Sequence, residues 1–190
     1  ACVQAGITGR ELVEILGKRG YTMGPEPDSI EFSTLGGWLA TKASGMKRSK
    51  YGNIEDIVVS ARVVSPQGVL WKGSNDEKIV SGRHAEGVDV QTLAFGSEGC
   101  LGIITNAVIR IWPLPEARDY GSVMFPRFED GLQFLKLLSR EPHMMPACIR
   151  LLDNAHFRLG QALRPEAPSW LHGVKDAATK ALASMYLSTD

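Results

Sequence analysis

Cysteine and histidine are scarce in this chain of 190 residues. The three cysteines, Cys2, Cys100 and Cys148, lie far apart and form no C-x-x-C pair, which argues against a disulfide framework and a cysteine-ligated zinc site. The four histidines are scattered without the spacing of metal ligands, so we predict no metal centre. This use of cysteine favours a reducing compartment inside the cell.

Long apolar runs and net charge are also missing. No run approaches the roughly 18 to 20 apolar residues that span a bilayer, and the N-terminus does not resemble a signal peptide. Lys and Arg together number 21, as do Asp and Glu, so no overall field attracts nucleic acid. We predict no nucleic-acid partner. The chain begins on Ala1 rather than Met, and we expect it to be a fragment of a longer protein.

Glycine is abundant, and residues 25–56 combine four glycines with several hydroxyl side chains and cations. Glycine permits close backbone approach, and amides and hydroxyls donate hydrogen bonds, so this composition suits a phosphate-bearing ligand. An ordinary glycine-rich surface loop is the alternative interpretation. The cations Lys47, Arg48 and Lys50 are predicted to form a solvated basic rim.

Local patterns before residue 90 predict several elements. Thr8 and Glu11 match a capping box that starts a helix ending near Arg19, and Gly20 is placed for a left-handed C-terminal residue. Elements are also predicted at residues 38–43 (a helical turn whose free amides face a ligand), 57–64 and 69–71 (a hairpin), and 73–89 (an exposed loop).

A second glycine cluster precedes a predicted strand at residues 105–112. Gly96, Gly99 and Gly102 are expected to adopt positive φ at the strand entry, and their turn could also contact a ligand. Within the strand, Ala107, Ile109 and Ile111 alternate with other residues, as in a half-buried strand.

The pattern changes after Pro115. The predicted elements are a strand at 120–125, a helix at 128–139, a strand at 147–152, a helix capped by Asp153 that runs to Leu163, and a helix at 175–186. This β-α-β-α order corresponds to half of a ferredoxin-like layer. We therefore place a domain boundary at residues 113–119.

Two stretches carry a family resemblance. Ser97-Glu98-Gly99-Cys100-Leu101-Gly102-Ile103-Ile104 resembles the S-E-G-x-L-G-I/V-I/V signature of the FAD-linked oxidase superfamily, which includes vanillyl-alcohol oxidase. Residues 28–56, together with 121–123, 149–154 and 160–163, resemble the alkyldihydroxyacetonephosphate synthase family of ether-lipid enzymes within it. The resemblance covers about residues 6–163.

The resemblance implies an α+β fold in two parts. Residues 1–115 would form the second half of a PCMH-type FAD-binding domain, with a mixed or antiparallel sheet and flanking helices. Residues 116–190 would begin a ferredoxin-like α+β cap domain that binds substrate. The family's pyrophosphate loop, its catalytic tyrosine and its histidine-rich segment have no match in the chain.

The resemblance also implies FAD as cofactor and assigns its contacts. The cofactor-binding residues would be Asp28, Ser29, Ile30, Glu31, Phe32, Ser33, Thr34, Thr41, Lys42, Ala43, Ser44, Glu98, Gly99, Cys100, Leu101, Gly102, Ile103 and Ile104. Lys42 stands where Arg is expected, and Cys100 where Thr is common. Backbone contacts survive both changes, but a thiol is a poor hydrogen-bond donor.

Arg150 matches the arginine that the family places beside the flavin, and we predict it to be catalytic. A permanent cation with forked donors can stabilise a departing carboxylate. The alternative is a surface arginine at the end of a strand.

The implied activity is a net non-redox exchange, in which the acyl group of acyl-dihydroxyacetone phosphate is replaced by a long-chain fatty alcohol. A homodimer, peripheral membrane contact, and a peroxisomal or glycosomal location are expected with it. One alternative is an FAD-linked dehydrogenase or oxidase of 2-hydroxy acids such as D-lactate or glycolate. Another is a non-catalytic module for ligand binding or assembly that keeps the fold without the chemistry.

Overall fold

The computed structural model describes residues 1–71 and 90–163, which fold as two compact units. The first unit contains Ala1–Arg118 and Pro146–Ile149, and the second contains Asp119–Met145 and, among the described residues, 150–163. The assignment of residues 1–115 to an FAD-binding domain and of 116–190 to a substrate cap stays a prediction. The predicted loop at 73–89 and helix at 175–186 lie outside the described residues.

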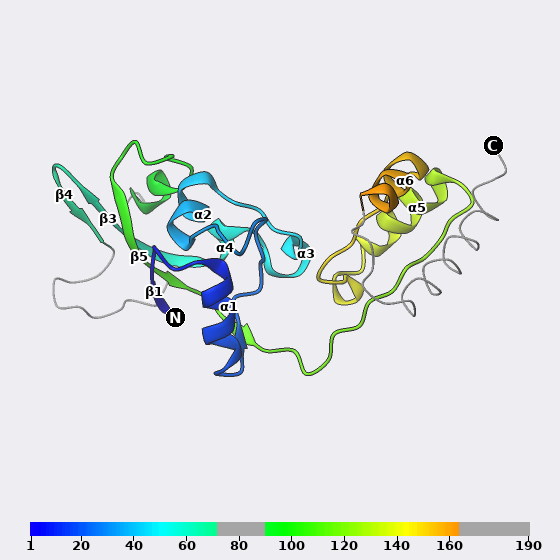
Figure 1. The fold of residues 1–190 in the computed structure, drawn as a ribbon, viewed down its shortest axis with the longest axis horizontal. Helices are drawn as coiled ribbons and strands as arrows, with labels where there is room; N and C mark the ends of the chain where they lie inside the picture. Colours follow the sequence, from blue (N-terminus) through cyan, green and yellow to red (C-terminus); the bar gives the residue numbers. More distant parts are fainter. Residues whose placement is uncertain (72–89, 164–190) are drawn as a thin grey trace. The chain divides into compact units, whose positions relative to one another are not determined.

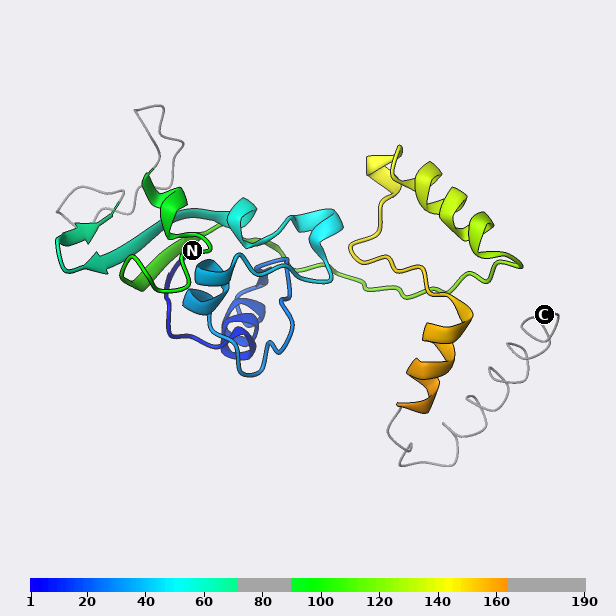
Figure 2. The ribbon, with the colours of Figure 1, turned by 90° about the horizontal axis from the view of Figure 1, so that it is seen from above.

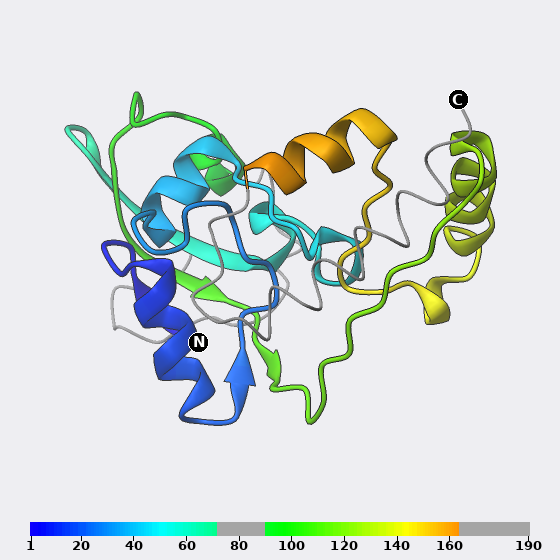
Figure 3. The same ribbon diagram turned by 45° about the vertical axis from the view of Figure 1, so that its right-hand side comes forward.

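The first unit is built on an antiparallel sheet with the strand order β1-β5-β3-β4 (Figure 1). Its strands are β1 (Cys2–Gln4), β3 (Val58–Ser65), β4 (Gly68–Leu70) and β5 (Ile103–Ile109). A second pair, β2 (Tyr21–Thr22) and β6 (Trp112–Pro113), lies side by side (Figure 3). The predicted hairpin is confirmed, because Val64 pairs with Val69 and Ser65 with Gly68.

The predicted strand at 105–112 is divided in the structure, since β5 ends at Ile109 and pairs with β3, whereas β6 begins at Trp112 and pairs with β2. Its expected alternation is also wrong. Ala107, Val108 and Ile109 are all buried, with at most 3% of each side chain exposed. Because consecutive side chains of a strand point to opposite faces, both faces of the sheet are covered at this part of β5.

The helices and 3₁₀ turns of the first unit are α1 (Gly9–Gly17), α2 (Leu35–Thr41), α3 (Arg48–Tyr51), α4 (Ile54–Ile57) and η1 (Val90–Ala94). The predicted capping box of α1 is confirmed: the Glu11 amide donates to Thr8 Oγ1 at 3.4 Å, and the Thr8 amide donates to Glu11 Oε2 at 3.1 Å. The bonds that the Thr8 amide and the Thr8 hydroxyl donate to the Glu11 carboxylate hold the pKa of Glu11 below its ordinary value. The helix ends at Gly17, slightly before the predicted end, and Gly20 has the expected positive φ of 76°.

The hydrophobic core lies where α1 and α2 cover the same side of the sheet (Figure 2). It consists of Leu12, Leu16, Met23, Leu35, Trp38, Leu39, Ile54, Ile57, Ala61, Ala107 and Ile109. Leu12 and Leu16 follow the helical spacing that the sequence predicts for the buried face of α1. The core thus fixes α2 against the sheet.

The second unit contains the helices α5 (Phe128–Leu138) and α6 (Asn154–Ala162) and the 3₁₀ turn η2 (Pro142–Met144). Both predicted helices are confirmed. Asp153 caps α6, because its Oδ1 accepts from the His156 amide at 2.7 Å, and this bond lowers the pKa of Asp153. Among the described residues, no helix is both long and apolar enough to cross a membrane.

The strands predicted at 120–125 and 147–152 are wrong, since neither segment pairs with another described strand. Tyr120 and Val123 are 91% and 67% exposed. Leu151 packs instead on α5, so closely that a Cβ on Gly131 would lie 2.6 Å from Leu151 Cδ1. Apolar content alone was therefore not sufficient to predict strands in these two segments. The described residues do not form the expected ferredoxin-like layer.

The turn into β5 generates a stability prediction. Gly102 has φ of +149°, and a Cβ there would lie 2.4 Å from the backbone oxygen of Val64. Gly68→Ala is the matched control, because Gly68 has a similar φ of +143° but open space around it. We expect Gly68→Ala to lower the free energy of unfolding by about 1–3 kcal/mol, the cost of positive φ, and Gly102→Ala to lower it further.

Urea denaturation of both variants measures this difference. Equal losses in the two variants would show that the contact with Val64 does not constrain Gly102.

Candidate functional site

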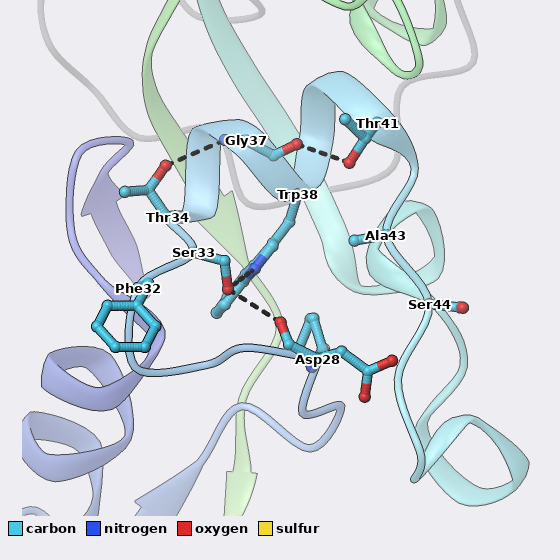
Figure 4. A pocket seen from close by; sticks show the side chains of 10 residues that line it. Asp28, Phe32, Ser33, Thr34, Gly37, Trp38, Thr41, Ala43 and Ser44 are labelled. Atoms are coloured by element: carbon cyan, nitrogen blue, oxygen red, sulfur yellow. Dashed lines mark hydrogen bonds between the residues drawn. The ribbon is translucent and has the colours of Figure 1, made fainter.

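A pocket of about 500 Å³ lies between α2, the loop that precedes it and the residues that follow it (Figure 4). Its lining residues are Pro27, Asp28, Phe32, Ser33, Thr34, Gly37, Trp38, Thr41, Ala43 and Ser44. Figure 4 shows the Phe32 ring and the Ser44 hydroxyl at opposite ends, with Trp38 between them. Phe32 is 84% exposed, whereas Trp38 is 2% exposed. The pocket therefore has an exposed aromatic rim and a buried aromatic base.

The helix of the pocket begins earlier than the sequence predicts and does not offer free amides. α2 starts at Leu35, not at residue 38, and it includes both adjacent glycines. The Leu35 and Gly36 amides donate to the carbonyls of Ile7 (3.1 Å) and Ala5 (2.8 Å). The Gly37 amide donates to Thr34 Oγ1 at 3.3 Å. The expectation that this helix start binds a ligand through its amides is wrong, because the N-terminal segment and the cap already satisfy them.

The loop before α2 is held from two sides. The first amides of α1 donate to carbonyls of the loop. The Gly9 amide donates to the Ser33 carbonyl at 3.0 Å, and the Arg10 amide donates to the Ile30 carbonyl at 2.9 Å. From the other side, Trp38 Nε1 donates to Ser33 Oγ at 2.8 Å. The amides of Ser29, Ile30 and Glu31, between the pocket residues Asp28 and Phe32, donate to no other described residue. They are available to a ligand.

The second glycine cluster meets the opposite end of α2. The Gly96 amide donates to the Leu39 carbonyl at 3.0 Å, and the Glu98 amide donates to the Ala40 carbonyl at 2.9 Å. These bonds give the carbonyls at the end of α2 partners outside the helix, although the Leu39 carbonyl also accepts from the Lys42 amide at 3.3 Å. The positive φ values predicted for the three glycines of the cluster are confirmed, and Glu98 shares this conformation with φ of 49°.

Lys42 joins the two glycine-rich segments. It is the left-handed C-cap of α2, with φ of 51°, and its aliphatic stem lies over Gly96, where a Cβ would be 3.4 Å from Lys42 Cδ. The structure thus brings together both segments that the resemblance assigns to the cofactor, although they are far apart in the sequence.

The predicted cofactor contacts divide into three groups. Those that line the pocket are Asp28, Phe32, Ser33, Thr34, Thr41, Ala43 and Ser44. Those that adjoin it in the loop or at the end of α2 are Ser29, Ile30, Glu31, Lys42 and Glu98. Those that continue from the glycine turn into β5 and do not line the pocket are Gly99, Cys100, Leu101, Gly102, Ile103 and Ile104.

Three lining residues, Pro27, Gly37 and Trp38, were not predicted as contacts. Gly37 and Trp38 fall within the resembling stretch, and a large aromatic side chain beside two glycines was the available signal. The structure shows why Trp38 belongs to the site, since its ring is the buried base and its nitrogen bonds the loop.

The predicted basic rim is only partly solvated. Lys47 forms an ion pair with Glu26, with side chains 22% and 27% exposed, beside the bridge that joins Pro27 to Gly45. Arg48 and Lys50 are exposed. Lys47 therefore contributes to closing the pocket loop rather than to a free cationic surface.

Arg150 belongs to the second unit, immediately before the residues that lead to α6. It is exposed and makes no hydrogen bond or ion pair with another described residue. Its exposure is compatible with binding an anion, and its role stays a prediction.

The pocket residues fit part of FAD. The exposed Phe32 ring offers a face to a flat heterocycle, and the hydroxyl of Ser44 forms no hydrogen bond with a described residue. Two buried acceptors, Asn53 Oδ1 and Glu55 Oε2, also lack partners among the described residues. They flank Ile54, whose amide donates to the carbonyl of the pocket residue Ala43 at 3.4 Å. Neither Asn53 nor Glu55 lines the pocket.

Comparison with known proteins supports the same cofactor. Residues 1–74 match the family described as FAD binding domain. The alkyldihydroxyacetonephosphate synthase of Caenorhabditis elegans is 44% identical over 98% of this chain. The chain is therefore similar to part of the alkyldihydroxyacetonephosphate synthases. A solved structure of such a synthase covers 93% of the chain with a TM-score of 0.72 and 37% identity.

This similarity covers only part of the synthases. The chain spans 30% of the length of the Caenorhabditis elegans synthase and 32% of the solved one. A more distant relative, a D-lactate dehydrogenase of Archaeoglobus fulgidus, is 28% identical over 85% of the chain, which covers 35% of that relative. The predicted synthase resemblance and α+β FAD-binding fold are confirmed.

Phe32 generates a prediction about cofactor affinity. Phe32→Ala removes an aromatic face, and a lost aromatic contact of about 1 kcal/mol corresponds to about fivefold weaker binding. We expect this increase in the Kd for FAD, measured by flavin fluorescence titration of the protein that contains this chain. The melting temperature of the cofactor-free protein should not change, because Phe32 is 84% exposed.

Tyr120→Ala is the matched control, because Tyr120 is also an exposed aromatic residue but belongs to the other unit. An equal effect of both substitutions on the Kd would contradict a specific contact at Phe32.

Proposed function

We propose that the protein containing this chain is an FAD-dependent alkyl transferase of ether-lipid synthesis. It exchanges the acyl group of acyl-dihydroxyacetone phosphate for a long-chain fatty alcohol. The observation that carries the proposal is the 44% identity to an alkyldihydroxyacetonephosphate synthase over 98% of the chain. The pocket supports it, because the segments assigned to the cofactor meet around α2.

The residues of the chain have distinct roles in this proposal. The loop at 28–34 and residues 41–44 hold FAD, which when bound supplies the reactive ring for a net non-redox exchange. Phe32 and Trp38 would supply the aromatic part of this contact. The turn that contains Glu98 supports the end of α2.

Arg150 acts on the substrate in this proposal. Its guanidinium offers two parallel donors to the fatty acid carboxylate as that group departs, and this interaction grows as the negative charge develops. The exposed, unpaired state of Arg150 among the described residues supports this assignment.

The surroundings of the enzyme follow from the same proposal. We infer a peroxisomal or glycosomal location, a homodimer, and peripheral contact with the membrane that supplies the long-chain substrates. The similarity to the synthases supports these inferences.

One experiment separates this function from its alternative. The protein is incubated anaerobically with acyl-dihydroxyacetone phosphate and labelled hexadecanol while the flavin absorbance is recorded. We expect label in an ether product without lasting bleaching of the flavin. The alternative, oxidation of a 2-hydroxy acid, is favoured by the more distant similarity to a D-lactate dehydrogenase. Bleaching by D-lactate or glycolate without label transfer would establish that alternative.

Arg150→Lys tests the role of the forked donors. Lysine keeps the positive charge but loses the bidentate geometry, so we expect turnover to fall more than tenfold, or above about 1.4 kcal/mol in the barrier. The far-ultraviolet circular dichroism should not change, because Arg150 is exposed.

Arg140→Lys is the control, since Arg140 is an exposed arginine of the same unit whose side chain has no partner among the described residues. If Arg150→Lys turns over as fast as the control, Arg150 is an ordinary surface residue.

A further inference from the structure

The indole of Trp38 makes a hydrogen bond that packing alone does not require. Its ring is 2% exposed, and its Nε1 donates to Ser33 Oγ at 2.8 Å (Figure 4). A buried indole N–H without a partner would cost about 1–3 kcal/mol. This bond therefore fixes the Ser33 hydroxyl relative to the core.

The Ser33 hydroxyl passes this constraint to the loop. Because the indole donates to its oxygen, its single proton is directed away from Trp38. Two carbonyl oxygens lie within reach of that proton, Ser29 O at 2.9 Å and Asp28 O at 3.2 Å. The hydrogen bonds thus run in one direction, from indole to hydroxyl to backbone carbonyl.

The Ser29 carbonyl is the centre of a tight turn. Ser29 O also accepts from the amides of Phe32 and Ser33, both at 2.9 Å. Ser29 itself has φ of 53°, a conformation that costs a residue other than glycine about 1–3 kcal/mol. Three converging donors hold this strained residue in place, and the hydroxyl from Ser33 is the donor that depends on Trp38.

The turn sets the direction of two pocket residues. Asp28 and Phe32 lie on either side of Ser29 and line the pocket, where Phe32 remains 84% exposed. A phenyl ring that is this exposed has few packing contacts to hold it, so its position depends mainly on the backbone of the turn.

We propose that Trp38 is a positioning residue for the cofactor pocket, acting through Ser33 to hold the loop at 28–33 in the conformation that receives FAD. This inference rests on the proposed function in one respect, that FAD is the ligand of the pocket.

The test uses Trp38→Phe, which keeps an aromatic ring in the core but removes the N–H donor. In the protein that contains this chain, we expect the Kd for FAD to rise at least fivefold and the visible circular dichroism of bound flavin to change. Ser33→Ala should produce the same two changes, and Ser33→Thr, which keeps the hydroxyl, should restore both. The double variant with both Trp38→Phe and Ser33→Ala should bind FAD no more weakly than Ser33→Ala alone, because the two residues act through the same chain of hydrogen bonds.

Ser65→Ala is the matched control. Its hydroxyl also donates to a carbonyl, that of Gly68 at 3.0 Å, but in the hairpin between β3 and β4, outside the pocket lining. It should leave the Kd and the flavin spectrum unchanged. If Trp38→Phe does not fold, Ser33→Ala and Ser33→Thr carry the test by themselves.

The outcomes separate the two proposals. Wild-type protein that binds FAD, with Ser33→Ala indistinguishable from Ser65→Ala in Kd and flavin spectrum, would overturn the positioning role alone. A lower melting temperature of Ser33→Ala, with its Kd for FAD and its flavin spectrum unchanged, would also overturn the positioning role. That result would show that the hydrogen bonds of Ser33 serve stability alone. Failure of the wild-type protein to bind FAD would overturn the proposed function as well.

Discussion

The close approach of α1 to α2 is the constraint on which the pocket depends. A Cβ on Gly9 would lie 2.6 Å from the Trp38 ring and 2.4 Å from Ile30 Cγ1. Only glycine lets the first turn of α1 lie near enough to bond the loop carbonyls while the indole fills the space beneath. Gly36 allows a second close approach, since a Cβ there would be 3.0 Å from the Ala5 side chain. The glycines of this region thus serve packing between protein segments as much as ligand access.

α2 connects the features of the site although it is only seven residues long. Its N-terminal amides bond the segment after β1, and its C-terminal carbonyls bond the glycine turn before β5. Its exposed side contributes Gly37 and Thr41 to the pocket, and its buried side contributes Leu39 to the core. A displacement of this helix therefore affects the core and the pocket together.

Features that depend on neighbouring residues were predictable from the sequence. The capping box of α1, the Asp153 cap, the hairpin and the positive φ of the glycine turn each require a few adjacent residues, and all are confirmed. Features that depend on distant partners were not. The sequence does not reveal that Ala5 and Ile7 accept the amides of α2, or that Trp38 bonds Ser33.

The strands expected at 120–125 and 147–152 failed for a related reason. Their apolar residues are typical of strands, but a strand also needs a neighbouring backbone, which no local pattern specifies. The family resemblance located most of the pocket lining, because it carries over tertiary relationships that spacing within one sequence cannot show.

The contact between the glycine turn and α2 also joins segments that lie far apart in the sequence. The Leu39 and Ala40 carbonyls precede their partners, the Gly96 and Glu98 amides, by a long stretch that includes β3 and β4. Closing so long a loop carries an entropic cost that the contacts of the folded first unit must offset. The end of α2 therefore keeps this support only while the first unit is folded as a whole.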